Sequence, residues 1–398
     1  MDTRHAHGYP ALRHRNGQHA HVTFEELFFD LVYVFAVTQL SHELLHHLGL
    51  GGLIETLVLW FAVWLGWQYT CWTTNWFDPE TPRIRGLLFT TMLLALLMAC
   101  AIPGAFGDRG LIFAGCYAAM QVGRTAFLLL ELGPDHPLAA NHRRILAWLL
   151  IAAVFWIAGG LLQGEARIAC WIAAAACEYL SPMFGFAFPG LGRSSTREWT
   201  IEGGHLAERC QLFVIVALGE TLLASGATLA DTPSWGADIL LALGATFIGT
   251  LAMWWLYFGT SSKHATAVIT SSADPGRIGA YFHYIHAILV AGIIGCAVGN
   301  DLVMAHPHAG LQTTQVLTLV GGPALYLLGS AVYKHVVYGC IPLSHIVGVL
   351  LLLALVPVGY GSSLLVMGWL TTAVLLLVGL WEMRTHRQPV MGPGHGGH

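Results

Sequence analysis

Two carboxylates stand four residues apart at the start of a strongly apolar stretch. Glu26 and Asp30 belong to the segment 26–36, which otherwise has the composition of a membrane-spanning helix. At this spacing both side chains lie on one face of a helix. A carboxylate at hydrocarbon depth costs roughly 2.5–3.5 kcal/mol even on lenient insertion scales, so it faces protein or water and marks a pathway or a buried partner. We expect Glu26 and Asp30 either to pair with a buried cationic side chain or to line a pathway.

A second apolar segment carries charges of both signs. Arg209 and Glu220 are eleven residues apart, which places them on nearly the same helix face but about 16 Å apart along the axis. They cannot pair with each other. Arg209 is instead at the depth at which it would meet Glu26 or Asp30, whereas Glu220 would lie past the midplane of the bilayer. A structural ion pair and a functional pathway are both open interpretations of these four residues.

Further polar residues inside apolar segments are secondary candidates for the site. Arg124 and Glu178 could neutralise one another within the first half of the chain. His283 and His286 are one turn apart, and because histidine titrates near neutral pH they could relay protons with Glu220 or simply hydrogen-bond between helices. The remaining secondary candidates are Gln39, His205 and Glu208.

One motif suggests metal chemistry. Residues 42–46 match the H-E-x-x-H pattern, in which two histidines on one helix face bind zinc and a glutamate acts as general base. His42 and His46 are therefore weak metal candidates. A working site would need a third ligand, which the sequence does not identify, and short matches arise readily among 21 histidines. We expect no metal centre and no other cofactor, and we keep an intramembrane enzyme acting on lipid or peptide as an alternative.

The composition places these residues in a polytopic membrane protein. Of the 398 residues, 56% are hydrophobic and only 10% are charged, with a mean hydropathy of +0.63, whereas soluble domains are about a quarter charged. Apolar runs long enough to span a bilayer predict an all-α transmembrane helix bundle of twelve helices. The predicted segments are 27–46, 53–75, 86–106, 111–131, 145–162, 168–188, 206–227, 236–258, 281–304, 315–334, 342–360 and 363–382.

The distribution of basic residues predicts the orientation of the helices. Fourteen of the eighteen Lys and Arg residues fall in the N-terminus, the even-numbered loops and their helix edges, or the C-terminus. The opposite side receives only Arg109 and Arg167, while Arg124 and Arg209 lie inside helices. By the positive-inside rule both termini are cytoplasmic, and residues 47–52 and 228–235 are external. No cleavable signal peptide is visible, and the eight scattered cysteines suggest neither a disulfide framework nor a zinc site.

The chain also has a faintly duplicated organisation. The third segment opens at Pro82 and the ninth at Pro275, each just after an aromatic helix end. Two six-helix halves would be parallel repeats, because an even number of helices returns the chain to the same side. The predicted division is a disordered cytoplasmic tail, a first half, a cytoplasmic linker, a second half and a disordered tail, at residues 1–22, 23–190, 191–204, 205–385 and 386–398.

At the motif level the chain resembles a known family. Residues 26–36 with the following TQL at 38–40, and the segments 205–209 and 212–220, resemble the bacterial low temperature requirement A family of membrane proteins. The resemblance extends over about residues 22–385. It implies a multi-pass protein of the bacterial cytoplasmic membrane. It implies no particular activity, because the family is named for growth in the cold.

A more remote resemblance is mechanistic. The Phe-Ser-Asp potassium channel family carries an Arg-x-x-x-Phe-Ser-Asp pattern at the start of the first helix of each six-helix repeat, and these helices line the pore. Here the first segment keeps Phe28 and Asp30 of that pattern, and the seventh keeps Arg209 and Phe213. Neither segment has the whole pattern, so the resemblance implies pathway-lining first helices but no conserved ion selectivity.

Three classes of function follow. A channel or secondary transporter for a cation, proton or small solute is favoured by acids on equivalent helices; an enzyme and a non-transporting scaffold for cold or stress adaptation are the alternatives. Trp60, Trp64 and Trp67 form a helical stripe that could line a cavity for an apolar or cationic ligand, or pack in the core. No nucleotide loop or nucleic-acid-binding stripe is present. The expected partners are the lipid bilayer, a small ion or solute, and a second copy of the chain if it forms a homodimer.

Overall fold

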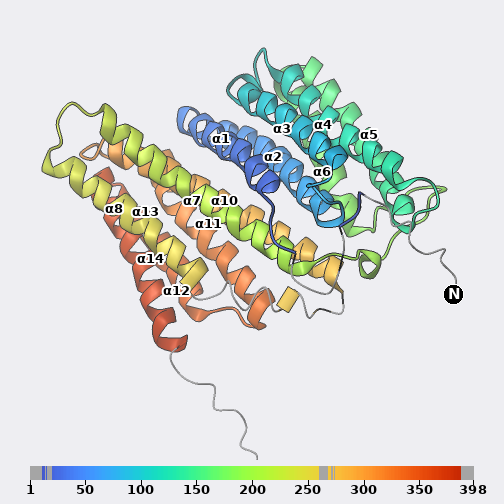
Figure 1. Ribbon diagram of the computed structural model, residues 1–398. Helices are drawn as coiled ribbons and strands as arrows, with labels where there is room; N and C mark the ends of the chain where they lie inside the picture. Colours follow the sequence, from blue (N-terminus) through green and yellow to red (C-terminus); the bar gives the residue numbers. More distant parts are fainter. Residues whose placement is uncertain are drawn as a thin grey trace, which may run out of the picture. The chain divides into compact units, whose positions relative to one another are not determined.

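The protein is almost entirely helical (Figure 1). The computed structural model describes residues 11–13, 15, 20–259, 268–269, 272 and 274–386, and these contain no β-strand beyond isolated bridges. The long helices are α1 (Phe24–His46), α2 (Leu50–Trp76), α3 (Pro82–Ala101), α4 (Gly110–Leu132), α5 (Pro137–Leu161), α6 (Gly164–Met183), α7 (Gly203–Asp231), α8 (Ala237–Trp254), α10 (Pro275–Ala305), α11 (Thr313–Tyr338), α12 (Leu343–Ala354) and α14 (Leu364–His386).

Every predicted segment coincides with helix, which confirms the all-α class. Two predicted segments end or break where proline changes the backbone. The sixth is predicted to reach residue 188, but α6 contains Pro182 and ends at Met183, after which Gly185 has a φ of +63°. The eleventh breaks after Ala354, and a short helix, α13 (Val356–Gly359), follows with a proline in its first turn.

Nine helices of the described chain are long and apolar enough to cross a membrane, by length and composition. They are α2, α3, α4, α5, α7, α8, α10, α11 and α14, where α3 and α8 continue into the short helices η1 (Ile102–Gly104) and η3 (Trp255–Gly259). A spanning helix must be long enough to cross the hydrocarbon core and apolar enough to face lipid. A helix suits this environment because it satisfies its backbone hydrogen bonds within one segment.

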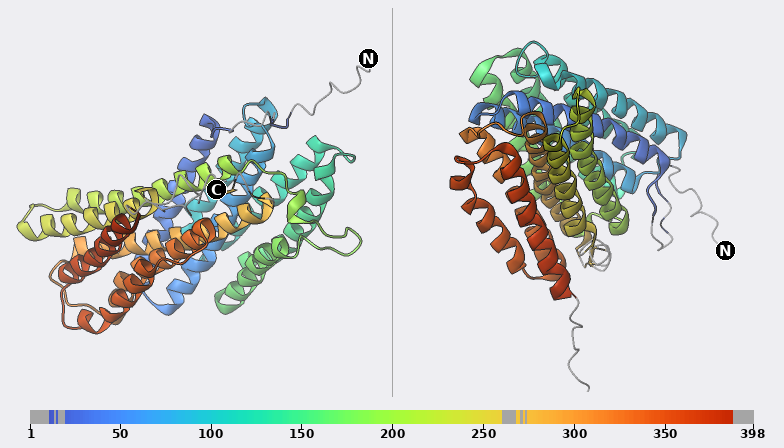
Figure 2. Two further views of the ribbon diagram at one scale, coloured as in Figure 1. Left: turned by 90° about the horizontal axis from the view of Figure 1, so that it is seen from below. Right: turned by 90° about the vertical axis from the view of Figure 1, so that its left-hand side faces the viewer.

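The helices form two compact units. The first comprises residues up to Glu220 together with 266–287, and the second comprises 221–265 together with 288–398. The boundaries fall inside α7 and α10, so each of these helices contributes to both units. In the first unit α3, α4, α5 and α6 pack as successive neighbours, and α1 lies against α2 and α3. In the second, α14 packs against α8, α11 and α12 (Figure 2).

The two compact units are defined by which residues lie close together. The two halves predicted from the sequence are instead defined by an internal repeat. The two six-helix halves therefore stay a prediction. The predicted tails are only partly described: residues 1–10, 14, 16–19 and 387–398 lie outside the described residues. Residues 11–13 do not behave as the predicted disordered tail, because Leu12 bridges to Phe77 and the Arg13 backbone N–H donates to the Trp76 carbonyl. Backbone pairing with the end of α2 holds this stretch in place.

Glycines allow close packing in the second unit. On α11, a Cβ atom added at Gly322 would lie 2.7 Å from the backbone of Gly295 and Cys296 on α10, whereas one added at the neighbouring Gly321 would meet nothing within 4 Å. Small residues at such crossings let helix backbones approach within van der Waals contact, which is a major source of stability between helices in lipid.

This difference gives a test of the packing. We expect Gly322→Ala to lower the free energy of unfolding by about 1–3 kcal/mol, as overpacking does. Gly321→Ala is its matched control and should leave stability unchanged or raise it by up to ~1 kcal/mol, because alanine restricts the unfolded chain. Unfolding of purified protein in mixed detergent micelles measures both, and equal effects at the two positions would contradict the packing described here.

Candidate ion-pair site

The beginning of α1 places Glu26 at the centre of a polar cluster. Thr23 precedes the helix as its N-cap and forms a capping box with Glu26: the Thr23 backbone N–H and hydroxyl donate to Glu26 Oε2 over 2.9 and 3.1 Å. Such a box satisfies backbone donors that a helix start leaves open. Glu26 is fully buried, so the cap also fixes the direction in which its second oxygen, Oε1, faces the protein.

Arg209 of α7 joins Glu26 and Asp30 of α1. Its Nη2 lies 2.6 Å from Asp30 Oδ1, and its Nη1 lies 3.2 Å from Glu26 Oε1. The indole N–H of Trp67 on α2 donates to the same Asp30 oxygen over 2.8 Å, and the guanidinium lies 5.9 Å from the Trp67 ring centroid. The structure thus brings Glu26, Asp30 and Arg209 together, as the depths of the two segments predicted.

Only one of the two carboxylate oxygens of Asp30 accepts hydrogen bonds from the described residues. Oδ1 accepts from Arg209 and Trp67, whereas Oδ2 is buried and has no hydrogen-bond partner among the described residues. Arg209 Nε is likewise buried and unpartnered within that part of the chain. An unpaired acceptor on a buried carboxylate is costly, and it is also the atom at which a proton can be added without breaking an existing hydrogen bond.

Three residues complete the cluster on the side of the chain's N-terminal segment. Arg13 Nη2 lies 2.8 Å from Glu26 Oε2, and His205 Nε2 lies 2.8 Å from Glu26 Oε1. Asn75 Nδ2 lies 3.1 Å from His205 Nδ1. This pattern assigns a neutral His205 that donates from Nε2 and accepts at Nδ1. With His205 neutral, two arginines balance two carboxylates, and the buried cluster carries no net charge.

A second network in the first unit surrounds Glu178 of α6. Its carboxylate accepts from the Tyr117 hydroxyl over 2.6 Å, from Gln121 Nε2 over 3.0 Å and from the Trp156 indole over 2.8 Å. The predicted pairing of Glu178 with Arg124 is indirect, because Gln121 stands between them and accepts from Arg124. Both charged residues of this network are almost completely buried.

A third network lies in the second unit and is not among the residues predicted from sequence. Lys334 of α11 forms an ion pair with Glu382 of α14, and both are nearly completely buried. Glu382 Oε1 also accepts from Ser344 over 3.1 Å and lies 3.2 Å from His345 Nδ1, while His345 Nε2 lies 3.0 Å from the Ser330 hydroxyl. In the sequence, Lys334 and Glu382 each stand at the end of a predicted segment, 315–334 and 363–382. Charged residues are common at such positions, so neither stands out as a buried partner.

The remaining candidates lie apart from the Arg209 cluster or at its edge. Glu220 is buried and accepts a hydrogen bond from Thr38 of α1. His283 Nδ1 and His286 Nδ1 lie 2.9 and 2.6 Å from carbonyl oxygens one turn earlier on α10, which fits the helix-packing interpretation. The half-buried candidates are Gln39 and Glu208.

The weak metal candidates lie on the surface, whereas the tryptophan stripe is buried. His42 and His46 are exposed, and no group of three or more His, Cys, Asp or Glu side chains gathers to hold a metal within the described ranges. The tryptophan stripe packs rather than lining a cavity: the rings of Trp60, Trp64 and Trp67 lie 6.5, 5.3 and 4.5 Å from the ring of Phe213.

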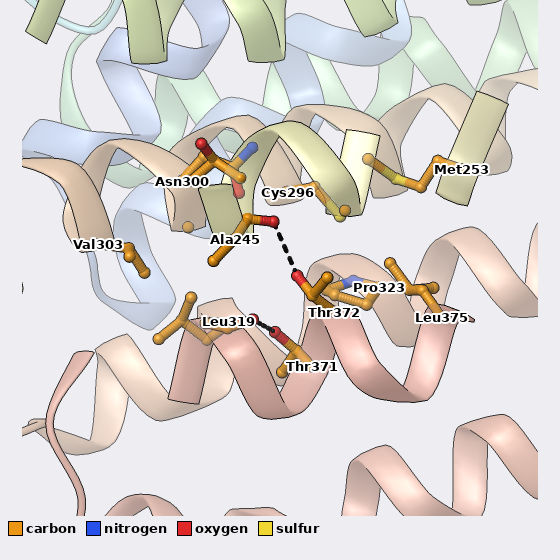
Figure 3. A pocket seen from close by; sticks show the side chains of 14 residues that line it. Ala245, Met253, Cys296, Asn300, Val303, Leu319, Pro323, Thr371, Thr372 and Leu375 are labelled. Carbon is orange, nitrogen blue, oxygen red and sulfur yellow. Dashed lines mark hydrogen bonds between the residues drawn. The ribbon is translucent and has the colours of Figure 1, made fainter. Parts of the chain in front are cut away.

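The second unit contains a cavity lined mostly by small and polar residues (Figure 3). Its threonine hydroxyls are committed to the backbone, since Thr372 donates to the Ala245 carbonyl over 3.0 Å and Thr371 to the Gly368 carbonyl over 3.0 Å. Side-chain-to-backbone bonds of this kind satisfy hydroxyls without water. We therefore interpret the cavity as part of a helix contact in which α14 is tied to α8.

The helices and their buried charge networks define an integral membrane protein that crosses the bilayer several times. The chain belongs to the bacterial low temperature requirement A family, whose model, described as "Bacterial low temperature requirement A protein (LtrA)", matches residues 21–380. It is 39% identical over 377 residues to an uncharacterized protein of Rhizobium meliloti (strain 1021), covering 93% of this chain and 91% of that protein. No solved structure matches it. The family resemblance seen in the sequence is confirmed.

The cluster around Arg209 gives a prediction about stability. Arg209→Gln leaves Asp30 without its cation, and removing one partner of a buried pair costs about 3–5 kcal/mol. Adding Asp30→Asn removes the stranded charge, so the double variant should be more stable than Arg209→Gln alone, with a coupling of at least ~1 kcal/mol. Unfolding midpoints in detergent measure this cycle.

The control is a surface pair in the same unit. Arg83 Nη1 lies 2.9 Å from Glu131 Oε1, and the Arg83 side chain is 76% exposed. Exposed pairs contribute about 0–1 kcal/mol, so Arg83→Gln should have little effect. Strictly additive effects of Arg209→Gln and Asp30→Asn would show that the two residues do not interact.

Proposed function

We propose that the protein is a secondary transporter in which proton binding at Asp30 opens the ion pairs between α1 and α7. The observation that carries this proposal is the state of Asp30: buried, paired through Oδ1 with Arg209, and unpartnered at Oδ2 among the described residues. Adding a proton at Oδ2 removes the negative charge that holds Arg209. The cluster then carries a net positive charge in low dielectric, which favours a rearrangement of α1 against α7.

A passive pore lined by free acids fits this geometry less well. Glu26 and Asp30 are already neutralised by Arg209 and Arg13, so neither offers an uncompensated charge to a passing cation. A buried pair that can be broken and remade has two discrete arrangements, which is what alternating access requires. Glu220, bonded to Thr38 across the same two helices, is a second acid at which such a cycle could take up or release a proton.

Repeated charges support the proposal of two parallel halves. In the first half a buried cation on the fourth helix, Arg124, is linked to an acid near the end of the sixth, Glu178. In the second half Lys334 and Glu382 occupy the corresponding helices and pair directly. Parallel repeats are a common architecture of secondary transporters, and the recurrence of opposite charges on equivalent helices is harder to explain by composition alone.

We further propose a location in the bacterial cytoplasmic membrane with both termini cytoplasmic, on the fourteen-to-two distribution of basic residues. Asp231 and Glu198 are both exposed and are proposed to lie on opposite sides. In a variant in which the exposed Cys100 and Cys340 are serine, a membrane-impermeant maleimide added to intact cells should label Asp231→Cys but not Glu198→Cys. Permeabilised cells provide the control, and the reverse pattern would overturn the orientation.

Flux in reconstituted vesicles tests the transport proposal. Vesicles with a lumenal pH indicator, and with the membrane potential clamped, should show protein-dependent proton movement when candidate cations or small solutes are added on one side. Asp30→Asn keeps the shape of the side chain but cannot take up a proton, so it should abolish this movement. Glu220→Gln should shift its dependence on pH.

Glu131→Gln is the matched control, because it removes a carboxylate from the surface pair with Arg83, and it should transport normally. All variants must elute as folded protein of unchanged size. The proposal would be contradicted if vesicles containing the wild-type protein showed no flux of protons, potassium, sodium or any added solute across a range of pH and voltage. That result would favour the scaffold alternative.

A further inference from the structure

A long groove runs between α3 and α4 of the first unit (Figure 1). Its volume is about 640 Å³, which is within the range of small-molecule binding sites. Its lining extends along α3 from Arg83 to Leu94, a distance of about 16 Å at 1.5 Å per residue. The hydrocarbon core of a bilayer is about 30 Å thick, so a groove of this length along a spanning helix has the depth of one leaflet.

Small residues on both helices keep the groove open. Gly86 and Thr90 of α3 line it and are exposed, as are Ala119 and Gly123 of α4. A Cβ atom added at Gly86 or at Gly123 would meet nothing within 4 Å. Unlike Gly322, these glycines do not serve a close approach of two helices. They leave a space that larger side chains would fill.

One end of the groove is charged, whereas the rest is apolar or already satisfied. Its two threonine hydroxyls donate to carbonyl oxygens of their own helix. Arg83 is 76% exposed and donates from Nη1 to Glu131, so its other N–H groups are accessible to a ligand. Asp78 and Glu80 directly precede α3 and add negative charge next to this end. Arg124 also lines the groove but is almost completely buried.

We propose that this groove binds a phosphatidylethanolamine molecule from the leaflet on the Arg83 side. One acyl chain fills the apolar part of the groove, and the phosphate accepts hydrogen bonds from Arg83, because a guanidinium group matches phosphate oxygens in charge and geometry. The ammonium group of the same head group is attracted to Asp78 and Glu80. Phosphatidylglycerol has no positive charge to offer these acids, and diacylglycerol has no phosphate for Arg83.

This inference does not rest on the proposed transport. The groove shares no residue with the cluster around Arg209, and lipid binding is measured at equilibrium without a gradient. A chain that binds the lipid but moves no protons would keep this inference and lose the proposed function. A chain that moves protons but does not prefer this lipid would do the opposite.

The experiment is native mass spectrometry of the delipidated full chain in detergent, titrated with lipids that carry the same two oleoyl chains. We expect one molecule of dioleoylphosphatidylethanolamine to bind more tightly than any further molecule. Dioleoylphosphatidylglycerol should bind about threefold more weakly, because exposed charge pairs contribute little. Dioleoylglycerol should bind about tenfold more weakly, because it lacks the charge-assisted hydrogen bonds.

Substitutions separate the contribution of the head group from that of the chain. Arg83→Gln should weaken phosphatidylethanolamine binding about three- to tenfold, since an exposed charge-assisted hydrogen bond is lost, and should leave dioleoylglycerol unaffected. Gly123→Leu should weaken both lipids about tenfold, because its side chain occupies apolar surface that the acyl chain covers. Gly115→Leu is the matched control on α4: a Cβ atom there also meets nothing within 4 Å, but Gly115 does not line the groove.

Gly86→Leu fills the groove from α3 and covers the case in which Gly123→Leu does not fold. The proposal is overturned if phosphatidylethanolamine binds no more tightly than phosphatidylglycerol or dioleoylglycerol, or if the folded groove variants bind lipid as the wild type does. A dimer in the wild-type spectrum that disappears in Gly123→Leu would instead assign the groove to a second copy of the chain.

Discussion

The ion pairs of Arg209 with Glu26 and Asp30 are the interaction on which the first unit depends. They join the beginning of α1 to the first turns of α7 across nearly two hundred residues of chain. Each partner would be prohibitively costly to bury alone. Arg13 and a neutral His205 complete the balance. Because the charges cancel only when all of them are present and ionised, a proton added to Glu26 or Asp30 would leave the buried cluster with a net positive charge.

The same constraint shapes the other polar networks. A membrane interior supplies no water to satisfy stray donors and acceptors, and the buried carboxylates described above each lie in a group of hydrogen-bond donors or basic side chains. Glu178 accepts three hydrogen bonds from neutral side chains, and Glu382 pairs with Lys334 and accepts a hydrogen bond from Ser344. Asp30 Oδ2 is one of several buried side-chain polar atoms of the described chain that have no hydrogen-bond partner, and Arg209 Nε is another. Each such atom calls for an explanation.

Much of the fold follows from the sequence, because spanning helices are set by local composition. All the predicted segments are helical, but their bounds differ: α5 and α10 begin at Pro137 and Pro275 rather than at 145 and 281, and α6 ends at Met183 rather than at 188. The contact of Arg209 with the acids of α1 is also predictable, since matching depth in two helices leaves few partners. Thr23 and Glu26 form a capping box with a spacing that a sequence can reveal, although it is not among the features predicted above.

Other parts of the site could not be predicted in this way. The pairing of Lys334 with Glu382 and the approach of Asn75 to His205 depend on which helices become neighbours. A single sequence does not reveal which helices pack together.

The central claim is that Asp30 gains and loses a proton while the protein stays folded. Infrared difference spectroscopy of the protein in lipid, recorded as the pH is lowered, tests this directly. One component of the carboxylic acid C=O band that appears on acidification should be missing in Asp30→Asn and present in Glu131→Gln, because Asp30 is one of 22 Asp and Glu residues that contribute to this band. A spectrum of Asp30→Asn identical to that of the wild type, or an Asp30 carboxylate that stays ionised until the protein unfolds, would show that the Asp30–Arg209 pair is purely structural.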